Sequence, residues 1–342
     1  MNAIIFHQHG GIEQLVQEDI PLPTLGQEEV LVRVKACALN HLDIWIRQGI
    51  PAYNISLPHV SGSDVAGVIQ QVGTGVTTVS VGDAVMLSPG LSCWQCEWCL
   101  SGQDNLCPQF NVLGAQVDGG YAEYVKVPAI NTIALPPGLS FEAAAAFSLV
   151  SVTAWHMLFS LAHLQPGETV LVMGAGSGMG SMAIQMAHMI GARVLTTVGT
   201  AEKFVKAEAL GADVVINHTC EDVVKRVHDV TQNQGVDVVI EHIGEQVWDR
   251  CLRALARGGR LVTCGATTGG GVTIDLRYLF SRQLTIKGSY MGTRAELQQA
   301  IRLLSQGTLK PVVDTMFPLA EARKAQEHLL SRKAFGKVVL TV

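Results

Sequence analysis

The sequence predicts an α/β protein in which a doubly wound parallel sheet is inserted into a β-rich domain. Three features of the chain predict it. Short alternating segments that end at glycines come first, apolar runs alternating with helical patterns follow, and the chain closes with one helix and one strand. The 342 residues are enough for about two domains, and the 48% of hydrophobic residues are enough to give each a core.

The first part is expected to form a barrel-like β domain. Residues 30–38 alternate apolar with polar or small side chains, as a strand with one solvated face does, and residues 40–48 read as a short helix that ends at Gly49. Further strands are expected at residues 64–72, 84–87 and 122–127. Many short strands separated by glycine turns are typical of a closed or curved sheet.

The pattern changes after Pro136 and Pro137, where residues 143–161 predict a long helix. Residues 169–173 form a continuous apolar run, which is typical of a parallel strand buried on both faces. Helices are then expected at 182–190, 202–210, 221–230 and 246–256, alternating with strands at 193–198, 213–216, 237–240, 260–263 and 284–287. This alternation predicts a doubly wound parallel sheet.

The last segment, 315–342, is expected to carry a helix at 319–330 and a strand at 337–342 that returns to the first domain. The predicted β-rich domain therefore comprises residues 1–145 and 290–342, and the predicted nucleotide-binding domain comprises residues 146–289.

Composition excludes several classes of function. The net charge is −5, from 24 basic and 29 acidic residues, and no basic run suggests nucleic-acid binding. The N-terminus lacks the pattern of a signal peptide, and no apolar stretch is expected to reach the length of a membrane span. We therefore expect a cytoplasmic protein with no nucleic-acid or membrane partner.

One short segment holds four cysteines with the spacing C-x2-C-x2-C-x7-C, namely Cys93, Cys96, Cys99 and Cys107. Four thiolates on one short loop are the ligands of a closed, tetrahedral zinc site, whereas disulfides are disfavoured without a secretory signal. A complete set of four protein ligands leaves no position for substrate, so we expect one structural zinc here and the chemistry elsewhere.

A glycine-rich loop at residues 174–180 lies directly between a predicted strand and a predicted helix. In that context glycines allow a pyrophosphate to approach the backbone, and the helix N-terminus supplies N–H donors. The expected dinucleotide-binding residues of this loop are Gly176, Ser177, Gly178, Met179 and Gly180.

The next strand ends in Gly199 and Thr200 without the acidic residue that commonly holds an NAD ribose. Thr200 and Lys203 are instead candidates to bind a 2′-phosphate, although Glu202 weakens that interpretation. The sequence therefore favours NADPH over NADH.

These features together resemble the medium-chain, zinc-type alcohol dehydrogenase superfamily over essentially the whole chain. The cysteine cluster, residues 119–124 (GGYAEY) and the 174–180 loop carry the resemblance. Residues 38–43 (ALNHLD) and 197–200 (TVGT) are most similar to its quinone oxidoreductase-like branch. The resemblance implies a GroES-like catalytic domain around a Rossmann dinucleotide-binding domain.

The chain departs from that family at each ligand of the catalytic zinc. Asn40 stands where the family has a ligand Cys, and Ser63 stands where it has a ligand His. The third ligand position falls in the alanine run 143–146. Asn and Ser are poor zinc ligands beside thiolate and imidazole, so the resemblance implies a kept structural zinc and a lost catalytic one.

Without that Lewis acid, reduction of an activated C=C or a quinone by NADPH is the expected reaction, with a quinone, enone or aldehyde as substrate. The candidate catalytic residues are Asn40, as a donor to a carbonyl oxygen, His41 and Asp43, as a proton relay, and Tyr53, as a proton donor. By resemblance Thr153, Gly265 and Ala266 lie along the cofactor, and His218 and Lys337 lie near its adenosine and phosphate ends.

Two alternatives remain open. In the first, the protein is an alcohol dehydrogenase with a non-standard catalytic zinc, for which the candidate ligands are His41, His59, Asp43 and Asp64. In the second, it is a non-enzymatic NADPH-binding protein. The resemblance also implies a homodimer or homotetramer, for which residues 283–290 are a candidate edge strand.

Overall fold

The computed structural model describes residues 1–50 and 53–342. The described residues divide into two compact units. Unit 1 comprises Met1–Leu149, Thr293–Leu297 and Pro311–Val342, and unit 2 comprises Val150–Gly292 and Gln298–Lys310. The first junction falls close to the predicted one, whereas residues 298–310 group with unit 2 rather than with the β-rich domain.

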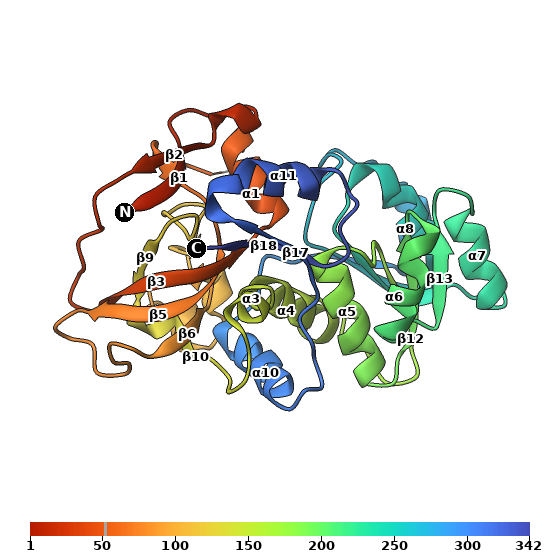
Figure 1. Ribbon diagram of the computed structural model, residues 1–342. Coiled ribbons are helices and arrows are strands. Elements are labelled where there is room, and N and C mark those ends of the chain that lie inside the picture. The colour runs from red at the N-terminus through yellow and green to blue at the C-terminus, as the bar shows by residue number, and fades with distance from the viewer. Residues whose placement is uncertain (51–52) are drawn as a thin grey trace. The chain divides into compact units, whose positions relative to one another are not determined.

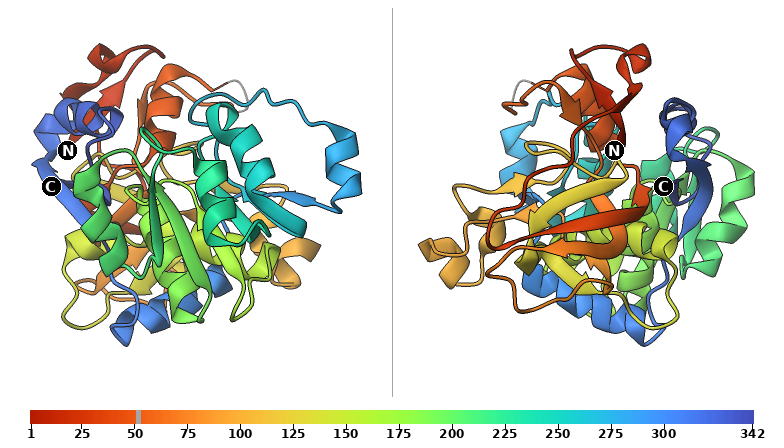
Figure 2. Two further views of the ribbon diagram at one scale, coloured as in Figure 1. Left: turned by 90° about the vertical axis from the view of Figure 1, so that its right-hand side faces the viewer. Right: turned by 60° about the vertical axis from the view of Figure 1, so that its left-hand side comes forward.

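The main sheet of unit 1 joins both ends of the chain. Its strand order is β10-β6-β5-β3-β18-β17, and β9 also pairs with β3. The strands are β3 (Glu29–Ala38), β5 (Asp64–Val72), β6 (Ala84–Leu87), β9 (Tyr124–Pro128), β10 (Thr132–Ala134), β17 (Val313–Pro318) and β18 (Lys337–Thr341). Figure 1 shows the blue β18 beside the red β3, and the two termini lie near each other in the views of Figure 2 as well.

Smaller elements complete unit 1. A sheet of order β2-β1-β4 contains β1 (Asn2–Phe6), β2 (Val16–Asp19) and β4 (His59–Val60), and β7 (Gly90–Leu91) pairs with β8 (Asn111–Val112). The helices are α1 (His41–Gln48), α2 (Glu97–Leu100), α3 (Phe141–Ala145) and α11 (Ala322–Leu330). The elements of unit 1 that were not predicted are short and carry little periodicity: β1, β2, β4, β7, β8, β10, β17 and α2.

The sheet of unit 2 is parallel throughout, with the order β13-β12-β11-β14-β15-β16. Its strands are β11 (Thr169–Val172), β12 (Arg193–Val198), β13 (Val214–Asn217), β14 (Val236–Glu241), β15 (Leu255–Thr263) and β16 (Thr285–Gly288). Its helices include α5 (Gly178–Met189), α6 (Phe204–Ala209), α7 (Val223–Val230), α8 (Trp248–Ala254) and α9 (Leu276–Ser281). This order confirms the predicted doubly wound fold. Successive strands are added on one side of β11 up to β13 and on its other side from β14 onward, and sheets of this kind bind ligands at that switch point.

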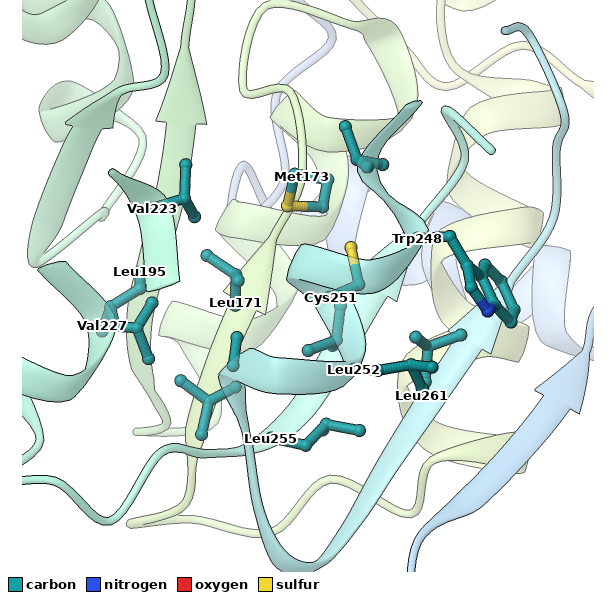
Figure 3. Packing of buried hydrophobic residues seen from close by; sticks show 14 of the residues in the cluster. Leu171, Met173, Leu195, Val223, Val227, Trp248, Cys251, Leu252, Leu255 and Leu261 are labelled. Atoms are coloured by element: carbon teal, nitrogen blue, oxygen red, sulfur yellow. The ribbon is translucent and has the colours of Figure 1, made fainter. Parts of the chain in front are cut away.

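A hydrophobic core holds these strands to the helices of unit 2. Leu171 of β11 and Leu195 of β12 are fully buried, as is Cys251 of α8. Figure 3 shows these side chains in one cluster with Val227 of α7 and Trp248 of α8. Each buried side chain of this size contributes about 1.5–3 kcal/mol relative to its exposed state, which fixes the sheet that carries the glycine-rich loop.

The predicted helix 143–161 is interrupted. It consists of α3, then α4 (Ser148–Trp155), then a π-helical stretch at His156–Leu161. Contrary to the expectation from the sequence, the whole stretch Phe141–Leu161 is long and apolar enough to cross a membrane by length and composition. Because 67% of its most apolar window is buried inside the protein, it has the character of a core helix. Helix α10 (Arg294–Ser305) was also not predicted.

Candidate active site and metal centre

Asn40 occupies the N-cap of α1, directly after β3. Its backbone N–H donates to Oδ2 of Asp43 at 2.8 Å, so the third helical residue satisfies the N-cap donor as in a capping box. The Asp43 N–H donates to the Asn40 backbone carbonyl at 3.1 Å, and the Asn40 side chain makes further hydrogen bonds outside the helix.

Three strands bring Asp64 and Lys337 to that side chain. Ala38 of β3 pairs with Asp64 of β5 on one side and with Val339 of β18 on the other. Lys337 precedes Val339 by two residues in an antiparallel strand, so the register places it opposite Asn40.

The three side chains form a closed hydrogen-bonded triangle. Nζ of Lys337 donates to Oδ1 of Asn40 at 2.6 Å and to Oδ2 of Asp64 at 2.9 Å. Nδ2 of Asn40 donates to the same Asp64 oxygen at 3.0 Å. The side chains of Lys337 and Asp64 are only 4% and 0% exposed, and the other oxygen of Asp64 accepts from the Leu149 N–H at 2.8 Å. A buried ion pair with this many partners is held in one geometry.

Asp43 lies behind this triangle and is completely buried. Its Oδ2 accepts from the Tyr121 hydroxyl at 3.1 Å as well as from the Asn40 N–H. Burial raises the pKa of Asp43 to about 6, against the lowering effect of the Asn40 N–H and of Lys337. Among the described residues, its Oδ1 and the buried hydroxyls of Ser61 and Ser63 have no hydrogen-bond partner.

The donor set around Asn40 does not fit a catalytic zinc. Asn40 and Ser63 are weak ligands, and the Lys337 ammonium already lies against Asn40 and Asp64, where it would repel a second cation. The predicted alternative ligands are not brought together either. His59 is bound through Nε2 to the Gly114 carbonyl at 3.1 Å, with Nδ1 at 3.4 Å from Asp118. Across residues 1–50 and 53–342, the four cysteines form the one group of three or more His, Cys, Asp or Glu residues placed to hold a metal ion.

The cysteine loop, by contrast, fits zinc. All four Sγ atoms lie within 4.8 Å of one another, and Sγ of Cys99 is 3.5 Å from that of Cys96 and 3.9 Å from that of Cys93. Thiolates at about 2.3 Å from a tetrahedral zinc are separated by about 3.8 Å, so these spacings suit the ion and are too long for disulfides. The four cysteines are therefore free thiols, and their spacing is that of the ligands of a structural zinc.

The thiols of this cluster differ in their tendency to ionise. The Gln95 N–H lowers the pKa of Cys93 to about 6, whereas burial raises the pKa of Cys99 to about 12. Four adjacent thiols cannot all ionise without a cation, and a divalent metal removes that conflict.

The glycine-rich loop of unit 2 begins after β11 and ends in the first turn of α5. Ser177 is the N-cap, and its Oγ accepts from the Gly180 N–H at 2.8 Å while donating to the Gly174 carbonyl at 3.0 Å. Gly174 has a φ of +70°, and a Cβ on Gly180 would lie 2.2 Å from the Gly174 carbonyl oxygen. Only glycine is compatible with this tight turn at Gly180.

His242 and Glu241 belong to this part of unit 2 and were missed by the sequence analysis. Nε2 of His242 lies 2.9 Å from the Met173 carbonyl and 3.1 Å from Ser177 Oγ. Glu241 is completely buried and accepts hydrogen bonds from the Ile243 and Gly244 N–H groups and from Thr263 Oγ1. Their position at the carboxyl end of β14, beside the switch point, is the signal that would have identified them.

The other predicted cofactor residues of unit 2 lie after its strands. Gly199 follows β12, and a Cβ there would be 3.3 Å from the His218 ring, so these two residues are neighbours. Gly265 follows β15 and lies against the His242 carbonyl, with Ala266 next to it. Thr200 is exposed and Lys203 half-buried at a 3-10 turn, and Thr153 is buried in α4.

The remaining predicted residues, Lys337, His41 and Tyr53, belong to unit 1. Lys337, expected near a cofactor phosphate, donates to Asn40 and Asp64 within unit 1. His41 is the first residue of α1, half-buried, with its ring 6.4 Å from that of Trp45. Tyr53 follows the undescribed residues 51–52, and its N–H donates to the Ile50 carbonyl at 3.1 Å.

Comparisons with known proteins agree with this architecture. The family described as "Alcohol dehydrogenase GroES-like domain" matches residues 26–137, and the family described as "Zinc-binding dehydrogenase" matches residues 178–306. An alcohol dehydrogenase of Geobacillus stearothermophilus is 34% identical over 94% of both chains. A quinone oxidoreductase of Rattus norvegicus is 32% identical over 99% of this chain and 97% of its own. A solved structure of a NAD-dependent alcohol dehydrogenase is 44% identical, with a TM-score of 0.96 over 100% of both chains.

These matches confirm the resemblance and the predicted pair of GroES-like and Rossmann domains, and they set aside a non-enzymatic role. The chain belongs to the medium-chain dehydrogenase/reductase superfamily of zinc-type alcohol dehydrogenases and quinone oxidoreductases, and it is an NAD(P)-dependent oxidoreductase.

Proposed function

We propose that the protein uses NADPH to reduce an activated C=C bond or a quinone without a catalytic zinc. The observation that carries this proposal is the triangle of Asn40, Asp64 and Lys337. It supplies a fixed ammonium and an amide donor around Asn40, where the resemblance to the superfamily implies a zinc-binding thiolate. Such a site is suited to hold a carbonyl or enolate oxygen, and it is poorly suited to bind a metal that would generate an alkoxide.

Bound NADPH would supply the hydride to the electron-poor carbon of the substrate. The Asn40 amide has a second Nδ2 hydrogen, besides the one given to Asp64, that can donate to the oxygen on which negative charge develops. His41, at the start of α1, and Tyr53 are the proposed sources of the proton that completes the reduction.

Asp43 has a different proposed role from the relay expected at first. Its carboxyl is completely buried and bonded to the Asn40 N–H and to Tyr121. Those contacts hold Asn40 in place, so Asp43 is proposed to act on the donor's position rather than on the substrate.

The proposed cofactor site lies at the carboxyl ends of β11, β12 and β15. The glycine-rich loop would bind the pyrophosphate through Gly176, Ser177, Gly178, Met179 and Gly180. The rest of the cofactor would be lined by Gly199, His218, Gly265, Ala266 and Thr153. Thr200 and Lys203 support NADPH over NADH, since the turn after β12 has no acid at the position that usually binds the ribose. The four cysteines would hold one structural zinc.

An alcohol dehydrogenase activity is the second candidate, because relatives at 34% and 44% identity carry that name. A homodimer or homotetramer is also proposed, since β16 pairs only with β15 among the described strands and leaves an open sheet edge. A cytoplasmic location fits the composition.

The test is a substrate panel of enones, quinones, enoyl thioesters, aldehydes and secondary alcohols, assayed with NADPH and NADH before and after treatment with a chelator. We expect turnover of enones or quinones with NADPH, unchanged by a chelator mild enough to leave the cysteine-bound zinc in place. Asn40→Asp, which replaces the amide donor by a carboxylate of the same size, should lose most of that turnover. Alcohol oxidation that a mild chelator abolishes would contradict the proposal.

A further inference from the structure

The Asn40 amide is oriented by two charged neighbours. Its oxygen accepts from the Lys337 ammonium at 2.6 Å, and its nitrogen donates to the Asp64 carboxylate at 3.0 Å. Rotating the amide by 180° would place its NH2 group against the ammonium and its oxygen against the carboxylate, so both contacts would become repulsive. The pair of charges therefore permits one orientation of Asn40.

This orientation has a chemical consequence. A cation bound to the amide oxygen withdraws electron density from the amide, and the remaining N–H becomes a stronger hydrogen-bond donor. Because Lys337 is 4% exposed and Asp64 is 0% exposed, water screens this effect little.

We propose that Lys337 is a positioning residue that fixes and polarises the Asn40 amide, which in turn selects substrates whose accepting carbon is conjugated to a carbonyl oxygen. This inference rests on the proposed function, because it names what the Asn40 donor recognises. Lys337 holds and polarises the Asn40 amide through its oxygen, and the remaining amide N–H stabilises the enolate oxygen. The competing role is the one expected from the sequence, direct binding of a cofactor phosphate by Lys337.

Steady-state kinetics on Lys337→Met, Asn40→Ala and the double variant separate these roles. If Lys337 acts through Asn40, Lys337→Met lowers kcat for an enone by about tenfold or more. The double variant is then no slower than Asn40→Ala, and the Kd of NADPH, measured by cofactor fluorescence, changes less than about twofold. Losses of kcat that multiply in the double variant, or a rise in the Kd of NADPH that accounts for the whole effect, would overturn the proposal.

Two further variants guard against a folding artefact. Lys337→Arg keeps a cation and is expected to restore part of kcat relative to Lys337→Met. Lys337→Met combined with Asp64→Asn removes both buried charges together, so the remaining carboxylate is not left unpaired. If this double variant folds and turns over enone as fast as the wild type, the charges of Lys337 and Asp64 next to Asn40 are irrelevant and the proposal fails.

A spectroscopic measurement separates this inference from the proposed function. The Asn40 side-chain amide, assigned in a 15N spectrum of the full-length protein by its loss in Asn40→Ala, should shift strongly in Lys337→Met and weakly in Lys337→Arg. An unchanged amide resonance overturns the inference whatever the substrate is. A shifted resonance without enone or quinone turnover would leave the Asn40–Lys337 coupling in place and contradict only the proposed reaction.

Discussion

The cysteine loop and the Asn40 triangle belong to the same structural unit, yet they offer opposite environments to a metal ion. At the loop, four sulfur atoms lie within 4.8 Å of one another. At the triangle, a lysine ammonium is paired with a carboxylate and an amide. One site gathers negative charge that needs a cation, and the other already contains its cation.

The two sites also differ in how they are assembled. Cys93 and Cys107 are 14 residues apart, so local chain geometry alone brings the four ligands close. Lys337 is 297 residues from Asn40 and 273 from Asp64, and only the pairing of β18 with β3 joins them. Locally encoded sites can be recognised from spacing, whereas a site built across strands depends on register.

The largest expected effect is at the cysteine loop. Cys96→Ser removes one thiolate, so the zinc content should fall from one per chain towards zero and the Tm by more than about 5 °C, because metal binding contributes directly to folding. Elemental analysis and a thermal melt measure both. Cys220→Ser is the matched control, since Cys220 is exposed and outside the cluster. A zinc-free wild type as stable as the zinc-loaded one would contradict the structural role.

A second prediction tests whether the ammonium is what keeps a metal away from the triangle. Asn40→Cys with Ser63→His restores two strong donors, yet we expect no additional zinc while Lys337 is present, because the fixed cation opposes the ion. Adding Lys337→Met should allow a second zinc, with Asp64 as a further ligand. Zinc per chain, corrected for the cysteine site, gives the answer. Two zinc ions in the double variant would show that the ligand losses alone explain the difference.

The last prediction concerns the buried carboxyl behind the triangle. Asp43 has a pKa raised from 3.8 to about 6 by burial, so the fold holds its proton more tightly than the unfolded chain does. Its contribution to stability is therefore complete below about pH 4 and is lost as the pH rises through about 6, amounting to at most about 3 kcal/mol.

Asp43→Asn should remove this pH dependence. The substitution keeps an oxygen for the Asn40 N–H and Tyr121 and places an NH2 group at Oδ1, which has no partner among the described residues. Urea unfolding of both proteins between pH 4 and 7 should show the stability of Asp43→Asn rising relative to the wild type, then levelling off. If the free energies of unfolding of the two proteins changed with pH in parallel, ionisation of Asp43 would not destabilise the fold, and the prediction would be wrong.

Much of the fold could be predicted from the sequence. The continuous apolar run before the glycine-rich loop and the strand–helix alternation after it predicted the parallel sheet, because buried strands leave a pattern in their own residues. The break between α3 and α4 was not predicted, since residues 143–161 are mostly apolar and contain no glycine or proline. Helix α10 was missed as well.

The sequence by itself determined the spacing of the four cysteines and the glycine-rich loop after a buried strand, and it predicts a missing catalytic zinc site, because each depends on residue types at short spacing. Tertiary structure alone decided which side chains surround Asn40. The register of β18 against β3 places Lys337 opposite Asn40, and the end of β14 places His242 against Ser177. Neither contact leaves a trace in local sequence, since strand pairing is set by hydrogen bonds and packing between segments far apart in the chain.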